Sequence, residues 1–479
     1  MLFVTLSFLI FFLVVYIVYW TIVPGYRMNW LLAASIFFYS TWSIPFTIHF
    51  IGMIAVNYYL LETYKARKRE WIFYLVQMIN VGNLVFFKYF YFFANMAGQL
   101  LGMEFLEETN LRSLHKLAGY EIILPLGISF YTFQVMAYGF DLKRGSYTRN
   151  HSFKEVLLFI TFFPQLIAGP IMRATELLPA IADYESLPIK EPSLEKIKLG
   201  LWYILIGVTK KLFIADKVGE ILNSFVATTP TDHNPLGIWI LCIAFIVMLY
   251  SDFSAYSDLA RGLGFLLGFT IPVNFRAPFF MYSFTELWKR WHLTFALWIR
   301  DYIFIPLGGS KEGEWRLYRN LIITFTLGGL WHGASYTFLI WGFLMGIFLS
   351  IEAFLSKRGY LELPANPILR VIRISAVWIL YLSTGVFFFA PNWTWALLAI
   401  QQMFSFGISV PGLLTSSQIG IILICFLIVL ALQWLELKPE NFKALERWEN
   451  ILLPIFILIL FVAITQMETP KKDFFYFQF

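Results

Sequence analysis

The sequence predicts an all-α polytopic membrane protein, with about eleven transmembrane helices and several short re-entrant or interfacial helices. Hydrophobic residues make up 59% of the 479 residues, charged residues only 14%, and the mean hydropathy is +0.69. Apolar segments follow one another along the whole chain, and some are too short or too interrupted by Pro and Gly to cross a bilayer alone. This composition excludes a soluble globular protein.

The first apolar segment, Met1–Val23, is expected to be retained as a transmembrane helix. No charged residue precedes Arg27, so the basic region of a removable signal peptide is missing. The later apolar segments are Trp30–Leu61, Trp71–Met96, Glu121–Phe140, Phe153–Ile171, Leu199–Val226, Leu236–Phe269, Phe295–Leu307, Asn320–Leu355, Ile372–Ala390, Trp393–Ile408, Ile419–Leu435 and Ile451–Ile464.

Two features of the N-terminal third predict how the chain sits in the bilayer. Tyr64–Glu70 is the densest short basic loop, and such loops stay cytoplasmic. The aromatic run Phe86–Phe93 is interpreted as an interfacial belt from which Lys88 snorkels toward water. No polar stretch is long enough to form a separate domain, so residues 1–479 are expected to form one membrane domain.

A polar cluster, Tyr250–Arg261, interrupts an otherwise apolar run. Asp258 and Arg261 stand three residues apart, which on a helix permits an ion pair, whereas Asp252 must find its partner elsewhere. We interpret this cluster mainly as a structural network.

A helix is predicted to begin at Ser283, because Ser283 and Glu286 have the spacing of a capping box. It is expected to end near Pro306 and to carry His292 on one face with Trp288 and Phe295.

The segment Asn320–Ile351 contains 32 residues without Asp, Glu, Lys or Arg. As one helix it would span about 48 Å, more than the roughly 30 Å hydrocarbon core, so it must tilt strongly or break. The expected break is at Gly328–Gly329 or at Gly333, directly after His332. Gly329/Gly333 and Gly342/Gly346 also have the small-xxx-small spacing of closely packed helices.

His292 and His332 are the candidate chemical groups, because an ionisable residue at membrane depth is costly and is often functional. The alternative is a neutral histidine that hydrogen-bonds one helix to another. The sequence contains no G-x-S-x-G, H-E-x-x-H or C-x-x-C, which leaves little support for a nucleophile elbow or a metal site. Imidazole can take the proton of an alcohol at neutral pH, which suits acyl transfer in a site that excludes water.

Six blocks of the sequence resemble, in order and spacing, the bacterial membrane-bound O-acyltransferases, in particular their alginate O-acetyltransferase branch, which is related to the teichoic-acid D-alanyl transferases. The blocks are Leu124–Gln134, Phe163–Ile171, Asp252–Asp258, Trp288–His292, Arg300–Gly309 and Gly328–Ala334, within a signature core of residues 120–350. The resemblance implies a ring of helices around a narrow channel, with His332 as the catalytic histidine and His292 as the second histidine.

The resemblance further implies a function and its partners. We expect an O-acyltransferase of the bacterial inner membrane that takes an acyl group from a cytosolic thioester donor, acetyl-CoA, to O-acetylate an exported polysaccharide such as alginate, with a separate extracytoplasmic transferase as partner. Neither a bound cofactor nor a metal is expected, and the excess of basic over acidic residues, 36 against 30, is interpreted as helix-flanking charge and not as a nucleic-acid site. The residues expected to contact the donor are Lys289, Arg290, Trp288, Trp331 and Asp301.

Two other functions remain open at this point. A secondary transporter would also use broken helices and intramembrane His, Asp and Arg, but it predicts polar residues shared between two repeats, whereas here they cluster once. A non-catalytic scaffold for an extracytoplasmic transferase would retain its activity without His332.

Overall fold

The computed structural model describes residues 3–117, 122–184, 193–360, 366–405 and 414–437, and every regular element in these ranges is helical. The predicted all-α class is therefore confirmed. The predicted apolar segment Ile451–Ile464 lies outside the described residues.

Within the described ranges, six helical runs are long and apolar enough to cross a membrane, which confirms a polytopic protein. They are α3 (Ile44–Arg67), α4 and α5 with the π-helical turn between them (Glu70–Leu101), α12 (Pro235–Leu266), α16 (Tyr336–Lys357), α17 (Pro367–Phe389) and α19 (Ser416–Leu437). The first predicted span forms α1 (Leu6–Thr21), a shorter apolar helix. The total of eleven spans and the central channel stay predictions.

The remaining helices are shorter or more polar. They are α2 (Arg27–Ser40), α6 (Glu108–Leu117), α7 (Ile128–Arg144), α8 (Phe153–Thr161), α9 (Ala174–Asp183), α10 (Leu194–Thr209), α11 (Asp216–Val226), α13 (Phe284–Trp288), α14 (Leu293–Ile299), α15 (Glu314–His332) and α18 (Trp393–Met403). Three π-helical turns interrupt longer runs: η2 (Val85–Tyr89), η4 (Lys210–Ala215) and η7 (Arg300–Phe304).

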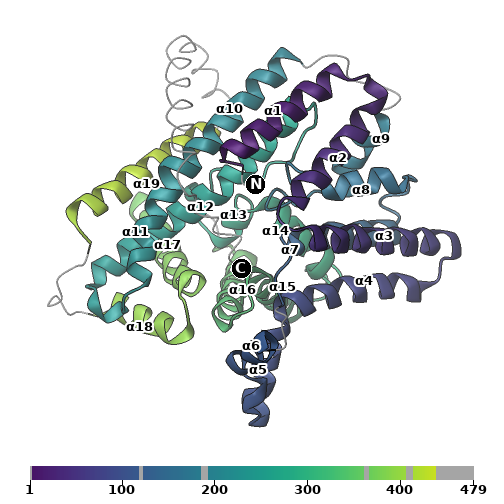
Figure 1. Ribbon diagram of the computed structural model, residues 1–479. Helices are drawn as coiled ribbons and strands as arrows, with labels where there is room; N and C mark the ends of the chain where they lie inside the picture. The colour runs from purple at the N-terminus through teal and green to yellow at the C-terminus, as the bar shows by residue number, and fades with distance from the viewer. Residues whose placement is uncertain (1–2, 118–121, 185–192, 361–365, 406–413, 438–479) are drawn as a thin grey trace.

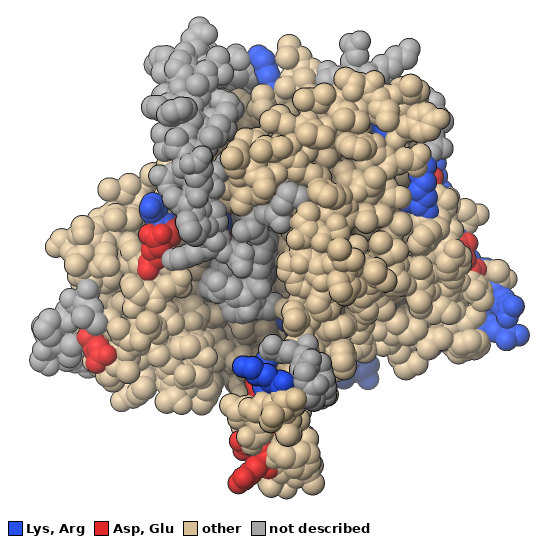
Figure 2. Space-filling view, viewed as in Figure 1, with Lys and Arg blue, Asp and Glu red and all other residues tan. Residues whose placement is uncertain are grey.

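The helices surround α12, the most deeply buried of the six runs, which packs against α10, α11, α17, α18 and α19 (Figure 1). On the opposite side, α3 and α4 lie side by side, and α5 and α6 project from the body as a separate hairpin. The face of the molecule in Figure 2 is mostly uncharged, with a few scattered groups of Lys, Arg, Asp and Glu, some of them on that hairpin. Exposed Ile48 and Leu427, at 68% and 61%, are side chains of the kind that face lipid.

Helices α15 and α16 form the closest-packed pair, as their glycine spacing predicts. A Cβ atom on Gly329 or Gly342 would overlap the backbone of the opposite helix, and one on Gly346 would lie 2.6 Å from the Cα atom of Ile322. The long apolar segment breaks after His332, where Gly333 is extended, so the predicted break is confirmed at Gly333 and not at Gly328–Gly329.

The polar cluster on α12 is held by two lysines of η4. Lys211 Nζ lies 2.7 Å from Asp252 Oδ1, and Lys210 Nζ lies 2.9 Å from Asp258 Oδ2. The predicted Asp258–Arg261 pair is wrong, because Asp258 forms its ion pair with Lys210. The Arg261 guanidinium instead stacks over the Tyr203 ring, 4.1 Å from the ring centroid.

Candidate active site

His292 lies at a break between two short helices. Ser283 caps α13 by accepting a hydrogen bond from the Glu286 backbone N–H at 3.0 Å, so the predicted helix start is confirmed. The predicted single helix to Pro306 is wrong, because His292 has a left-handed backbone with φ of +44° and α14 begins only after it. The Leu293 N–H donates to the Asn274 carbonyl at 2.9 Å, which holds the chain in this break.

The Asn274 side chain determines which ring nitrogen of His292 carries a hydrogen, that is, its tautomer. Asn274 Oδ1 accepts hydrogen bonds from the Thr294 backbone N–H at 3.3 Å and from its hydroxyl at 2.9 Å, so this atom is the amide oxygen. His292 Nδ1 lies 3.1 Å from the same oxygen and must therefore carry a hydrogen. The other ring nitrogen, Nε2, is buried and has no hydrogen-bond partner among the described residues. A neutral His292 thus presents a bare lone pair at Nε2.

The His332 ring lies in an aromatic enclosure at the end of α15. Its centroid is 5.0 Å from that of Trp331, 5.4 Å from Trp341 and 5.1 Å from Phe388. Only 4% of the residue is exposed, and the same ring borders a small cavity against α12 and α17. Bulk water is therefore kept away from this imidazole.

Phe295 lies between the two histidines. Its ring centroid is 5.0 Å from that of His292 and 5.4 Å from that of His332, so the histidine rings are separated by no more than one aromatic side chain. Trp331 also contacts both rings, at 6.1 and 5.0 Å. The structure thus brings together His292 and His332, which are 40 residues apart in the sequence.

Two indole N–H groups near the histidines have no acceptor in the part of the chain that the structure describes. They are Trp331 Nε1 and Trp288 Nε1, both buried, and both rings contact Phe295, at 4.7 and 6.5 Å between centroids. An unsatisfied buried donor is costly unless a ligand supplies the acceptor. The predicted contact of these tryptophans with the donor stays a prediction that this geometry favours.

A cavity of about 320 Å³ approaches His292 from the side of Asn274, which lines its wall. Its charged lining residues are the cations Lys210, Arg261, Arg276 and Arg290 and the anions Asp258 and Glu436, an excess of two positive charges. Arg290, one of the residues expected to contact the donor, therefore lies in the wall of a positively charged cavity. Lys289 lies outside the cavity lining, pairs with Glu286 and has a side chain that is 66% exposed.

Asp301 is separated from this group. Its carboxylate is ion-paired with Arg173 and Arg300, and its backbone carbonyl accepts a hydrogen bond from Arg144 at 2.7 Å. None of these contacts reaches a histidine. A role of Asp301 in donor binding stays a prediction without support from its position.

The sequence analysis missed several residues of the site: Asn274, Trp341, Phe388 and Lys88. The Lys88 ammonium group points inward and donates to the backbone carbonyls of Trp331 at 2.6 Å and His332 at 3.3 Å, so the predicted snorkelling toward water is wrong. The π-helical turn η2 carries Lys88, and turns of this kind often mark functional positions. An isolated lysine within an apolar aromatic run was the available signal.

Comparison with known proteins identifies the family of this chain. Residues 71–360 match the family model of the membrane-bound O-acyltransferases, and this range contains the predicted core of residues 120–350. A probable alginate O-acetylase of Pseudomonas putida is 32% identical over 95% of both chains. A peptidoglycan O-acetyltransferase of Helicobacter pylori is 34% identical over 69% of this chain and 65% of its own.

The predicted relationship to D-alanyl transferases is also confirmed, since a teichoic acid D-alanyltransferase of Bacillus subtilis is 27% identical over 52% of this chain and 64% of its own. The family match covers more than half of the 479 residues and includes both histidines. The chain is therefore an O-acyltransferase that belongs to the membrane-bound O-acyltransferase family.

Proposed function

We propose that this enzyme transfers an acetyl group from a cytosolic thioester donor, acetyl-CoA, through the bacterial inner membrane for O-acetylation of an exported polysaccharide such as alginate. The main support for this proposal is that two buried histidines, His292 and His332, both contact the rings of Phe295 and Trp331. The printed names of the relatives, alginate O-acetylase and peptidoglycan O-acetyltransferase, support an acetyl group and a glycan.

His332 is proposed as the general base. Its imidazole takes the proton of the acceptor hydroxyl while the hydroxyl oxygen attacks the thioester carbonyl carbon. A C–O bond forms, the C–S bond then breaks, and the imidazolium returns the proton to the leaving sulfur. The apolar enclosure of Trp331, Trp341 and Phe388 excludes water, which would otherwise hydrolyse the thioester.

His292 is proposed to bind the donor. Because its Nδ1 hydrogen is committed to Asn274, a neutral His292 can only accept a hydrogen bond at Nε2. It therefore suits an amide N–H of the pantetheine arm, whereas polarising the thioester carbonyl would require a protonated ring. The indole N–H groups of Trp288 and Trp331 can donate a hydrogen bond to that carbonyl, which a neutral His292 Nε2 cannot do.

The cavity beside Asn274 is proposed as the entrance for the donor. Its excess of positive charge attracts the phosphates of coenzyme A, and of the four cations that line the cavity, Arg290 and Arg276 lie nearest to His292 along the chain. Entry from the cytosol requires this cavity to open on the same side of the membrane as Tyr64–Glu70, the loop predicted to be cytoplasmic.

The acyl group is proposed to pass to a separate extracytoplasmic protein that modifies the polymer. The described residues form membrane helices and short connections, without a separate lobe that could hold a long glycan. The purified enzyme is therefore expected to bind donor yet acetylate little polymer by itself.

Native inner membranes that carry or lack this protein test the proposal. Inverted vesicles given acetyl-CoA labelled in the acetyl group should accumulate alkali-labile label only when the protein is present. Equal labelling with and without the protein, or with His332→Ala in place of the wild type, would contradict it.

A further inference from the structure

The last turn of α15, which carries His332, lacks the usual end of a helix. Its C-terminal carbonyls have no partner within the helix, and a left-handed glycine commonly provides one by closing the turn. Here Gly333 is extended, with φ of −167°, so it cannot close the turn in this way. A side chain at that glycine would collide with the ring of Phe338. Other groups must therefore satisfy the carbonyls next to His332.

Two consecutive residues of η2 supply these donors. Tyr89 donates its hydroxyl hydrogen to the Leu330 carbonyl at 2.9 Å. Lys88 donates to the carbonyls of Trp331 at 2.6 Å and His332 at 3.3 Å, and to the Ser129 hydroxyl at 3.3 Å. The three hydrogens of the ammonium group thus have three acceptors, none of which is a carboxylate in the part of the chain that the structure describes. The positive charge instead faces the negative end of the α15 dipole.

The two carbonyls held by Lys88 belong to the peptide units on either side of the His332 Cα atom. One ammonium group therefore restrains both backbone torsions from which the imidazole projects. A catalytic base must be held within about half an ångström of its working position, and a shift of about 1 Å can cost a hundredfold in rate. The direction of the His332 ring toward Phe295 and Trp341 thus depends on a residue 244 positions away.

We propose that Lys88 is a positioning residue for His332, which it holds through the main chain without touching either substrate. This proposal rests on the proposed function, in which His332 is the general base. Lys88 also lines a pocket of about 590 Å³, together with Gly333 and Ser335, which follow His332 in the chain.

The test replaces Lys88 by methionine, which keeps the length and apolar stem of the side chain but donates no hydrogen bond. Lys88→Met should lower kcat about ten- to a hundredfold while KM for acetyl-CoA, protein abundance and detergent melting temperature stay close to wild type. Lys88→Arg, which can donate to both carbonyls, should recover part of kcat. Lys143→Met is the matched control, because Lys143 pairs with Glu70 at the end of α7 and should leave kcat unchanged.

A double variant separates positioning from an independent effect. If Lys88 acts through His332, adding Lys88→Met to His332→Ala should cause no further loss of activity. A further tenfold loss, a raised donor KM at unchanged kcat, or a wild-type kcat in Lys88→Met would each overturn the proposal. If Lys88→Met does not accumulate in the membrane, Lys88→Gln is the variant to test. Its shorter amide side chain should lower kcat severalfold, and a wild-type kcat would overturn the proposal.

The positioning role and the proposed function can fail separately. Wild-type activity of His332→Gln contradicts the base role of His332, whatever Lys88 does. Wild-type kcat of Lys88→Met together with an inactive His332→Gln contradicts the positioning role alone.

Discussion

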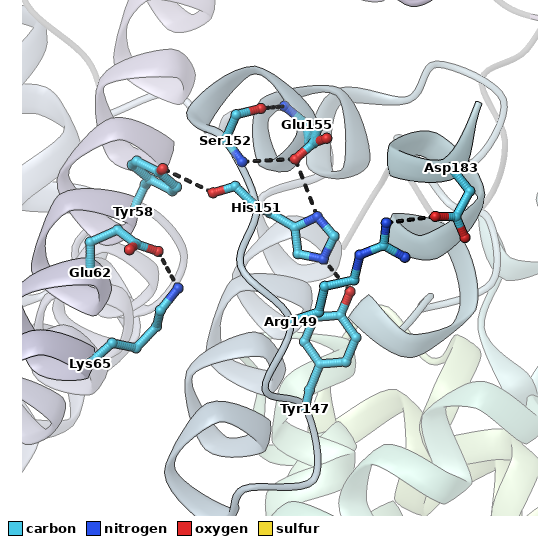
Figure 3. A network of polar contacts seen from close by, with 9 residues as sticks. All are labelled: Tyr58, Glu62, Lys65, Tyr147, Arg149, His151, Ser152, Glu155 and Asp183. Carbon is cyan, nitrogen blue, oxygen red and sulfur yellow. Dashed lines mark hydrogen bonds and ion pairs between the residues drawn. The ribbon is translucent and has the colours of Figure 1, made fainter. Parts of the chain in front are cut away.

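His151 and the pair of His292 and His332 are buried in opposite surroundings. Figure 3 shows His151, between α7 and α8, with both ring nitrogens occupied: Nε2 faces the Tyr147 hydroxyl and Nδ1 lies 3.3 Å from Glu155 Oε2. Its backbone carbonyl accepts a hydrogen bond from Tyr58 at 3.0 Å. His292 and His332 instead lie among Phe and Trp rings, and His292 keeps Nε2 without a partner.

The contrast between His151 and the other two histidines shows that burial alone does not identify a reactive histidine. A ring whose nitrogens are both bonded within the protein stabilises the fold and has no site left for a substrate proton. The His292 ring, which is held at Nδ1 by Asn274 and has no partner at Nε2 among the described residues, can exchange a proton with a ligand. Replacing each histidine should therefore separate effects on turnover from effects on stability.

The largest effect is expected at His332. His332→Ala should lower turnover by about two to four orders of magnitude, because a group needed in the transition state is removed, while donor binding and detergent stability stay near wild type. Membranes with matched amounts of protein, assayed for acetyl transfer, provide the measurement. A fall in protein abundance that accounts for the lost activity would contradict the assignment.

A smaller effect is expected at His292. His292→Ala should raise KM for the donor, lower turnover, or both, on the order of tenfold, because Nε2 no longer meets the ligand. Titration with a non-hydrolysable acetyl-CoA analogue measures the binding component directly. Unchanged analogue affinity together with unchanged turnover would assign His292 to the fold, alongside His151.

His151 should behave in the opposite way. His151→Ala removes two side-chain hydrogen bonds from a buried network and should lower the free energy of unfolding by about 1–3 kcal/mol. Activity per folded molecule should stay at the wild-type level. Thermal unfolding in detergent measures the loss of stability, and an activity assay on the folded fraction measures specific activity. A loss of specific activity without a loss of stability would contradict the structural role of His151.

The smallest effect concerns pH. Burial lowers the pKa of His151 below its ordinary value of about 6.5 and that of His233, also outside the spans, to about 4. The unfolded chain therefore binds more protons than the folded protein at pH values below about 6.5. Stability should fall as pH decreases from about 6.5 toward 4, and replacing both histidines by glutamine should flatten that decline. An unchanged slope in the double variant would rule out these two groups.

Much of the architecture could be predicted from local pattern. The all-helical class follows from composition, and the break at Gly333 follows from a charge-free segment longer than the bilayer is thick. The close packing of α15 and α16 follows from glycine spacing. These features depend on residues near one another in the sequence, which is why the sequence reveals them.

The errors arose where a distant segment overrode local pattern. His292 ends a predicted helix because Asn274, 18 residues away, bonds both its side chain and the following backbone. Asp258 pairs with Lys210 across 48 residues in place of Arg261 on its own helix. The Lys88 side chain points inward because its ammonium group donates to backbone carbonyls at the end of α15. Hydropathy of the local sequence does not reveal these distant acceptors.

The central claim is that His332 accepts a proton, and His332→Gln tests it most directly. Glutamine keeps hydrogen-bonding capacity and similar size but cannot act as a base near neutral pH. At matched protein levels in native membranes, we predict that this variant retains normal abundance and loses acetyl transfer by at least about a hundredfold. If it retains most of the wild-type transfer rate, His332 has a structural role and the proposed mechanism is wrong.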